Sequence, residues 1–171
     1  MSRVAYVKGR YIPHAEARVH VEDRGYQFAD GVYEVCEIWN GQLVDETRHL
    51  NRLERSLAEL SIRAPMPRAS LRVVMREVIR RNRVRNGLVY MQVTRGVARR
   101  DHAFPSDDTS PSLVITAKNL PAGRSDRLAE EGISVITVPD NRWARADIKS
   151  VCLLPNVLAK QKAKEAGARE A

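Results

Sequence analysis

Residues 32–39 restrict the fold of this chain more than any other segment. Their sequence, Val-Tyr-Glu-Val-Cys-Glu-Ile-Trp, is rich in β-branched and aromatic residues that favour strands. Asn40-Gly41 follows directly and is a strong signal for a tight hairpin turn. Because side chains alternate between the two faces of a strand, Tyr33 and Val35 share one face. The run therefore predicts a strand that ends in a hairpin and has a different environment on each face.

The neighbouring segments predict a small α+β domain of strands and two helices. Leucines at helical spacing indicate a helix over 46–62, and an amphipathic pattern indicates a second helix that starts at Pro67 and is capped by Gly87. A polar loop, 96–111, lacks periodicity, and loops of this length are often functional. The further strands are expected at 4–7, 18–21, 88–95 and 112–118.

The Pro- and Gly-containing segment after residue 120 predicts a domain boundary. We expect a small N-terminal domain over 1–120, a linker over 121–124, and the beginning of a larger α/β-type domain over 125–171. A strand at 133–138 and a helix at 155–166 are too little to close a hydrophobic core alone. The second domain is therefore expected to be incomplete.

Composition argues against several classes of protein. The longest apolar runs have four residues, far short of the roughly 20 that cross a bilayer, and no apolar signal region starts the chain, so a cytoplasmic location without a membrane is expected. Cys36 and Cys152 are far apart in apolar runs and are expected to be reduced and packed. Dinucleotide-type glycine motifs and HExxH are absent, and the 4 histidines share no metal-site spacing, so no metal is expected.

The net charge of +8 is concentrated in the arginine-rich stretch after Pro67. Arginines recur there every four residues, opposite the apolar positions of the predicted helix, so a solvated helix face explains them. A basic nucleic-acid-binding module is the alternative, but no aromatic residues interleave with the arginines to stack bases. We therefore expect no nucleic-acid partner.

Lys149 is the main candidate for chemistry. It follows Ile148 and precedes the apolar residues 151–154, a setting that lowers a lysine pKa by desolvation. A partly neutral amine can attack a carbonyl carbon and hold it covalently. The alternative is a structural ion pair with Asp147.

Two further cationic groups could bind anions. Arg100 and His102 lie two residues apart in the long loop, where a guanidinium and an imidazole suit a carboxylate. Arg52 has no acid one helical turn away and could hold a phosphate. In both cases the alternative is a charge that is simply solvated.

Four separated segments of the chain together resemble one known family. They are 22–34, 49–53, 92–96 with Arg100, His102 and Phe104-Pro105, and 147–150 with Leu153-Leu154 and Asn156. Their order and spacing are similar to those of the fold-type IV enzymes that depend on pyridoxal 5'-phosphate (PLP), and within these to the D-amino-acid transaminases. The match spans nearly the whole chain.

The resemblance implies a role for each candidate. Lys149 would bind PLP covalently and act as catalytic base, Arg52 would bind the PLP phosphate, and Tyr33 would be the active-site tyrosine. Arg100 and His102 would bind the substrate carboxylate. The implied function is transamination between D-amino acids, such as D-alanine, and a 2-oxo acid such as 2-oxoglutarate, by a homodimer.

Other functions stay open at this point. An aminodeoxychorismate lyase or a branched-chain amino-acid transaminase has the same fold, although their substrate loops differ. The resemblance also places a glutamate and a Ser/Thr-rich phosphate loop beyond Ala171. A truncated, non-catalytic domain is the alternative from another class.

Overall fold

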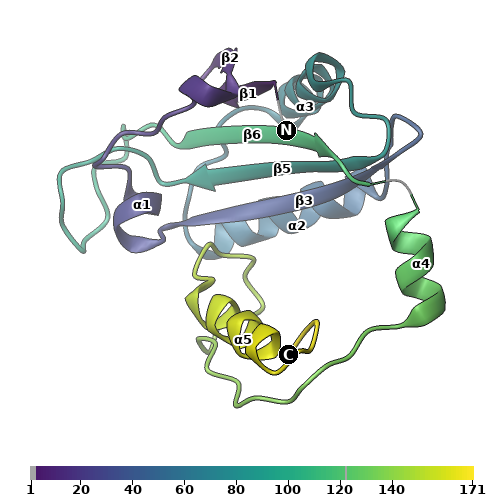
Figure 1. The fold of residues 1–171 in the computed structure, drawn as a ribbon. Coiled ribbons are helices and arrows are strands. Elements are labelled where there is room, and N and C mark those ends of the chain that lie inside the picture. The colour runs from purple at the N-terminus through teal and green to yellow at the C-terminus, as the bar shows by residue number, and fades with distance from the viewer. Residues whose placement is uncertain (1–2, 122) are drawn as a thin grey trace. The chain divides into compact units, whose positions relative to one another are not determined.

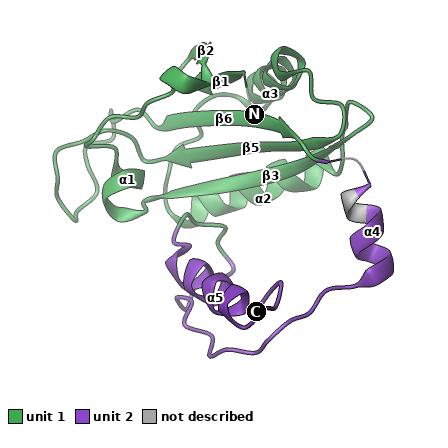
Figure 2. Ribbon diagram, in the orientation of Figure 1, with its two compact units in different colours: residues 1–120, 148–151 green, residues 121–147, 152–171 purple. Residues whose placement is uncertain are grey.

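A computed structural model describes residues 3–121 and 123–171. Figure 1 shows the order of the elements, and Figure 2 shows two compact units, residues 1–120 with 148–151 and residues 121–147 with 152–171. The segment Ile148–Val151 thus belongs to the first unit, although the chain reaches it after residues of the second. This return brings Lys149 into the first unit.

The first unit is built on a six-stranded antiparallel sheet with the strand order β2-β1-β6-β5-β3-β4. Figure 1 labels these strands except β4. The central pair, β3 and β5, runs from Gly31 opposite Thr94 to Ile38 opposite Gly87. The strands are β1 (Val4–Val7), β2 (Arg10–Pro13), β3 (Gly31–Trp39), β4 (Gln42–Leu43), β5 (Gly87–Thr94) and β6 (Ser112–Asn119).

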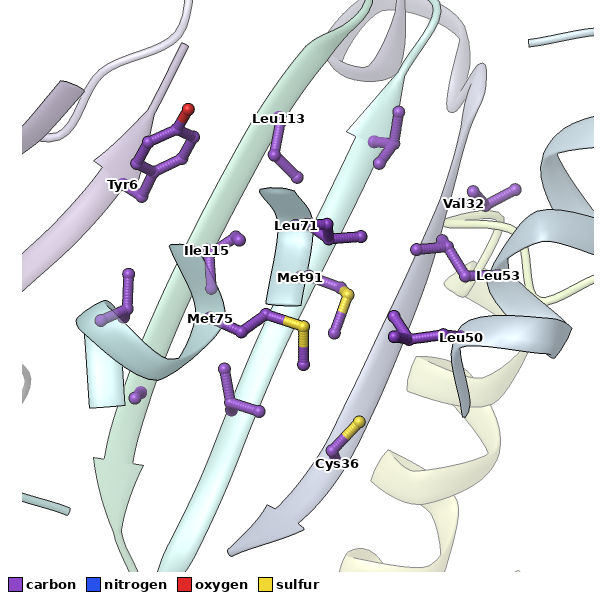
Figure 3. Close-up of a cluster of buried hydrophobic side chains, with 14 of the residues drawn as sticks. Tyr6, Val32, Cys36, Leu50, Leu53, Leu71, Met75, Met91, Leu113 and Ile115 are labelled. Atoms are coloured by element: carbon purple, nitrogen blue, oxygen red, sulfur yellow. The ribbon is translucent and has the colours of Figure 1, made fainter. Parts of the chain in front are cut away.

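Two helices, α2 (Glu46–Glu59) and α3 (Arg68–Asn82), pack on one face of this sheet: α2 contacts β3, and α3 contacts β6 and β1. Figure 3 shows the resulting core, in which leucines at helical spacing meet alternate side chains of the strands. A five-residue helix, α1 (Arg24–Phe28), precedes β3, and a 3-10 turn covers His14–Glu16. The prediction of a small α+β domain is confirmed.

The predicted hairpin and strand alternation are also confirmed. Asn40 and Gly41 both have positive φ angles, 49° and 80°, as a tight hairpin turn between β3 and β4 requires. Burial alternates along β3: Glu34 is fully buried on the side of α2, whereas Tyr33 is partly exposed on the other side. The two faces of β3 therefore carry different groups.

Two predictions about the first unit are wrong. Residues 18–21 form no strand, whereas β2 forms at Arg10–Pro13 because Lys8 and Gly9, with φ angles of 45° and 91°, turn the chain back along β1. Gly87 does not cap α3. That helix ends at Asn82 with a left-handed Arg83, and Gly87 begins β5, where a Cβ atom would clash with the carbonyl oxygen of Lys118.

The second unit contains α4 (Arg124–Glu131) and α5 (Leu154–Glu165). The predicted helix at 155–166 is confirmed, but α4 was not predicted. The strand expected at 133–138 is wrong, because this segment forms only one isolated bridge, between Val135 and Glu170. Local strand propensity does not suffice without a paired neighbour.

The cysteines differ in their surroundings. Cys36 is fully buried in the core of the first unit, and burial raises the pKa of its thiol to about 12. Cys152 is exposed, which corrects the expectation that it is packed. None of the helices in the described part of the chain has the length and apolar character needed to cross a membrane. The described residues also contain no cluster of three or more potential metal ligands from His, Cys, Asp and Glu.

Candidate active site

Lys149 is attached to the start of β3 by backbone hydrogen bonds. The Tyr33 amide donates to the carbonyl oxygen of Lys149 at 3.0 Å, and the Val151 amide donates to that of Gly31 at 3.0 Å. On the other side, the Lys149 amide donates to Oγ of Ser56 in α2 at 3.3 Å. These bonds position Lys149 between β3 and α2.

The side chain of Lys149 lies over the ring of Tyr33, with Nζ 4.1 Å from the ring centroid. The preceding Ile148 is buried in the core, whereas Lys149 itself is half-buried. Asp147, which was considered as an alternative partner, forms an ion pair with Arg145, with 3.0 Å between Oδ1 and Nε. The amine is thus held by a cation–π contact with the Tyr33 ring.

Tyr33 belongs to a polar and aromatic row on the sheet face that α2 and α3 do not cover. Its ring stacks on that of Tyr90 with 5.7 Å between centroids, and the Tyr90 hydroxyl donates to Oε1 of Gln92 at 2.7 Å. Burial raises the pKa of Tyr90 above its usual value, and the neighbouring Tyr33 adds a smaller contribution in the same direction. Tyr90 thus packs against the Tyr33 ring over which the Lys149 amine lies.

Arg52 in α2 is bound by a buried acid from β3. Its Nε and Nη2 donate to the two carboxylate oxygens of Glu34 at 2.5 and 2.8 Å, and Nδ1 of His49 lies 2.9 Å from the same carboxylate. Glu34 is fully buried, whereas the Arg52 side chain is 44% exposed. Nη1 of Arg52 has no hydrogen-bond partner among residues 3–121 and 123–171. This donor, on a guanidinium that Glu34 holds in place, is therefore available to bind an anion.

Sequence reasoning missed this partner because it searched for acids within the helix only. A signal was present: Glu34 is the only charged residue among the inward-facing positions Val32, Glu34, Cys36 and Ile38 of the strand. A buried acid at such a position requires a cation from the element that covers it. Arg52 also lies one helical turn before Ser56, which bonds to Lys149, so both predicted cofactor-binding residues are attached to one stretch of α2.

We expect the Glu34–Arg52 pair to make stability depend on acid pH. Burial raises the pKa of Glu34, but the hydrogen bonds and charges of Arg52 and His49 outweigh this effect and hold it below its ordinary value. The stabilisation is therefore complete above the ordinary pKa of a glutamate and is lost as pH falls through the lower, folded-state value.

Thermal unfolding from pH 7 to pH 3 tests this expectation. Glu34→Gln should lower the melting temperature at pH 7 by about 3–6 °C, given about 1.5 kcal/mol for the lost hydrogen bonds to a charged group, since the remaining Arg52 is partly solvated. The difference from wild type should shrink below pH 4. A constant difference across this range would show that the carboxylate charge is not responsible.

Arg100 and His102 both lie against Phe28, at the end of α1. The Arg100 guanidinium carbon is 4.8 Å from the Phe28 ring centroid, and the His102 ring centroid is 5.4 Å from it. Both side chains are exposed. The structure thus brings this predicted pair together, but within the described residues neither side chain makes a hydrogen bond, ion pair or ring contact with Lys149, Tyr33 or Arg52.

The loop that carries this pair leaves β5 through Gly96. Its φ angle is 109°, and a Cβ atom here would clash with the carbonyl oxygen of Ser110 at the other end of the loop. Gly96→Ala should therefore destabilise the first unit by about 1–3 kcal/mol and displace the loop. Gly9→Ala is the matched control, since Gly9 also has a positive φ of 91° but no atom within 4 Å of its Cβ position.

Melting temperatures of the two variants, compared with wild type, measure this difference. We expect Gly96→Ala to melt well below Gly9→Ala, because only the first adds a steric clash to the backbone strain. Equal melting temperatures would mean that the loop ends are not tightly apposed.

The arginine-rich face of α3 is paired with three acids, two from α2 and one from α3 itself. Arg72 and Arg76 both bind Glu46, with closest approaches of 3.1 and 2.8 Å. The remaining pairs are Arg68 with Glu54, and Arg80 and Arg81 with Glu77. These ion pairs give each of the five arginines an acidic partner.

Comparison with known proteins gives a consistent result. The family model for amino-transferase class IV matches residues 31–171. The D-alanine aminotransferase of Bacillus licheniformis is 44% identical over 163 residues, which cover 95% of this chain and 56% of that protein. The D-alanine aminotransferase of Staphylococcus haemolyticus is 42% identical over 166 residues, covering 97% and 58%.

Solved structures with a similar fold include two enzymes with other names. The Escherichia coli branched-chain amino acid aminotransferase has a TM-score of 0.81 at 20% identity, over 99% of this chain and 58% of that one. The 4-amino-4-deoxychorismate lyase of Pseudomonas aeruginosa has a TM-score of 0.75 at 26% identity, over 92% and 56%. The chain therefore spans little more than half the length of the proteins that it matches.

Proposed function

Because this chain belongs to the class IV aminotransferases, we propose that it provides the catalytic lysine of a PLP-dependent transaminase that acts on D-amino acids. The observation that carries the proposal is the position of Lys149, whose amine is fixed over Tyr33 and whose backbone is bonded to α2. Identity of 39–44% to D-alanine aminotransferases over almost the entire chain supports D-amino acids as substrates.

The donor groups of the first unit fit PLP. A related structure, a branched-chain aminotransferase at 20% identity, contains pyridoxamine 5'-phosphate. In this chain, the amine of Lys149 would bind the cofactor aldehyde, and the exposed Nη1 edge of Arg52 suits a phosphate. When bound, PLP withdraws electrons from the substrate Cα and so makes its hydrogen acidic.

Lys149 would then act as the general base and acid. Its Nζ accepts the proton from the substrate Cα and returns a proton later in the cycle, so the amine must alternate between its neutral and charged forms. The Tyr33 ring, with its centroid 4.1 Å from Nζ, limits where the amine can move. The fixed backbone of Lys149 makes proton transfer to one face of the substrate possible.

Arg100 and His102 would bind the substrate carboxylate. Two donors of different geometry on one anion fix its orientation, which decides whether the Cα hydrogen of a D- or an L-amino acid faces the base. Since neither member of this pair makes a hydrogen bond, ion pair or ring contact with Lys149 in the described part of the chain, the proposed homodimer would bring the pair of one copy to the lysine of another. A cytoplasmic location likewise stays a prediction.

The substrate assignment is tested with the complete protein that contains these residues, loaded with PLP. D-Alanine with 2-oxoglutarate should yield pyruvate and glutamate. L-Leucine and aminodeoxychorismate test the branched-chain transaminase and the lyase that share the fold. Preference for either of these over D-alanine would overturn the assignment while leaving the family intact.

A further inference from the structure

A buried charge cluster lies behind the loop that carries Arg100 and His102. Arg24 and Arg95 are only 3% and 8% exposed, and both bind the carboxylate of Asp30. Nε of Arg24 is 2.7 Å from Oδ2, and Arg95 binds both oxygens at 2.8 and 3.0 Å. Two buried cations on one acid exceed what is needed to neutralise it, so the second arginine requires another explanation.

Arg24 has a second set of partners in the loop. Its Nη1 donates to the carbonyl oxygen of Asp101 at 2.6 Å, and its Nη2 donates to that of His102 at 3.5 Å. One guanidinium thus connects Asp30, which lies just before β3, to the backbone of the loop residues next to Arg100. A planar fork with several donors can make these contacts at once, whereas a lysine ammonium cannot span them.

The Phe28 ring contacts both Arg24 and the side chains of the predicted pair. The guanidinium carbon of Arg24 is 4.9 Å from its ring centroid, and the same ring contacts Arg100 and His102. The loop backbone is therefore fixed by Arg24, and the two exposed side chains rest on Phe28. Without these contacts, two exposed side chains on a long loop would sample many rotamers and lose entropy on binding an anion.

We propose that Arg24 and Phe28 are positioning residues that pre-orient Arg100 and His102 for a substrate carboxylate. This inference rests on the proposed function, because it takes the carboxylate as the ligand of that pair. It predicts that loss of Arg24 weakens the binding of amino acid and 2-oxo acid alike, since both present a carboxylate, while the proton transfer by Lys149 continues.

Arg95 provides a matched control. It shares Asp30 with Arg24 and is similarly buried, but its other donors bind the carbonyl oxygens of Leu60 and Ser61 after α2, and its guanidinium lies 3.7 Å from the Phe104 ring centroid. Arg95→Lys and Arg24→Lys therefore disturb the same acid. Only Arg24→Lys releases the carbonyl groups of Asp101 and His102.

The test compares both variants and wild type as complete, PLP-loaded proteins. Hydrogen exchange measured by mass spectrometry should become faster in residues 99–103 of Arg24→Lys and stay unchanged there in Arg95→Lys. For D-alanine and 2-oxoglutarate, KM should rise at least about tenfold in Arg24→Lys with kcat within about threefold of wild type. Phe28→Leu removes no buried charge and should also raise KM. This second variant tests the inference if Arg24→Lys does not fold.

The outcomes separate this inference from the proposed function. Unchanged exchange in residues 99–103, or an equal rise of KM in Arg24→Lys and Arg95→Lys, would overturn the positioning role. A fall in kcat with constant KM would also overturn it, since a generally damaged site behaves in that way. A wild-type protein that does not use D-amino acids would instead overturn the proposed function, whereas hydrogen exchange in residues 99–103 would still decide the positioning role of Arg24.

Discussion

Replacing Lys149 with alanine should abolish transamination, lowering kcat by about 10⁴-fold, because it removes the amine over Tyr33 to which the proposed function assigns transfer of the Cα proton. The covalent attachment of the cofactor, visible in its absorbance spectrum, should disappear with it. Folding should be little affected, since the cation–π contact contributes only about 0.5–2 kcal/mol.

Lys118→Ala is the matched control for this prediction. Lys118 is an exposed lysine of the same unit, in β6 opposite Leu88, and its removal should leave activity and spectrum unchanged. Lys149→Arg should be as inactive as Lys149→Ala, because a guanidinium does not lose its proton near neutral pH. Activity above about 1% of wild type in Lys149→Ala would contradict the assignment of the base.

Replacing Arg52 with alanine should have two separable effects. It leaves the carboxylate of Glu34 buried with only His49 as partner, which should lower the free energy of unfolding by about 3 kcal/mol at neutral pH. It also removes the exposed Nη1 edge, which should weaken PLP binding about 10–100-fold, the range of one hydrogen bond to a charged group.

The double variant Glu34→Gln with Arg52→Ala distinguishes these effects. Removing the buried charge should restore much of the stability but none of the cofactor affinity. Arg48→Ala, an exposed arginine one turn earlier in α2, is the control and should change neither quantity. If PLP affinity in Arg52→Ala equals that of wild type, Arg52 is a structural partner of Glu34 and nothing more.

The elements that are predictable from the sequence are those whose pattern is local. The alternation in β3, the Asn40-Gly41 turn and the leucine spacing of α2 each depend on neighbours within one element. Arg18–Val21 shows the limit: its alternating polar and apolar residues suit a strand, but none of the strands in the described residues pairs with this segment. The pairing partner of a strand is a property of the whole sheet.

The candidate site is also predictable only in part, because its residues come from elements that are distant in sequence. Lys149, Arg52 and Tyr33 can be identified as residues from the sequence, but the contact of Lys149 with Tyr33 depends on the return of residues 148–151 to β3, over more than a hundred residues of chain. Likewise, the Glu34–Arg52 pair and the contacts of Arg24 with Asp101 and His102 join elements that are distant in sequence. Composition and spacing reveal the charged groups, whereas only the fold determines which of them meet.

The central claim is that PLP binds to the amine at position 149. Reduction of the PLP-loaded complete protein with borohydride converts a covalent link to the cofactor into a stable one, and mass spectrometry of the digested protein then locates the modified lysine. We predict that the phosphopyridoxyl group is found on Lys149 and is absent from this position in unreduced protein. A group on any other lysine, or none at all, would contradict the account.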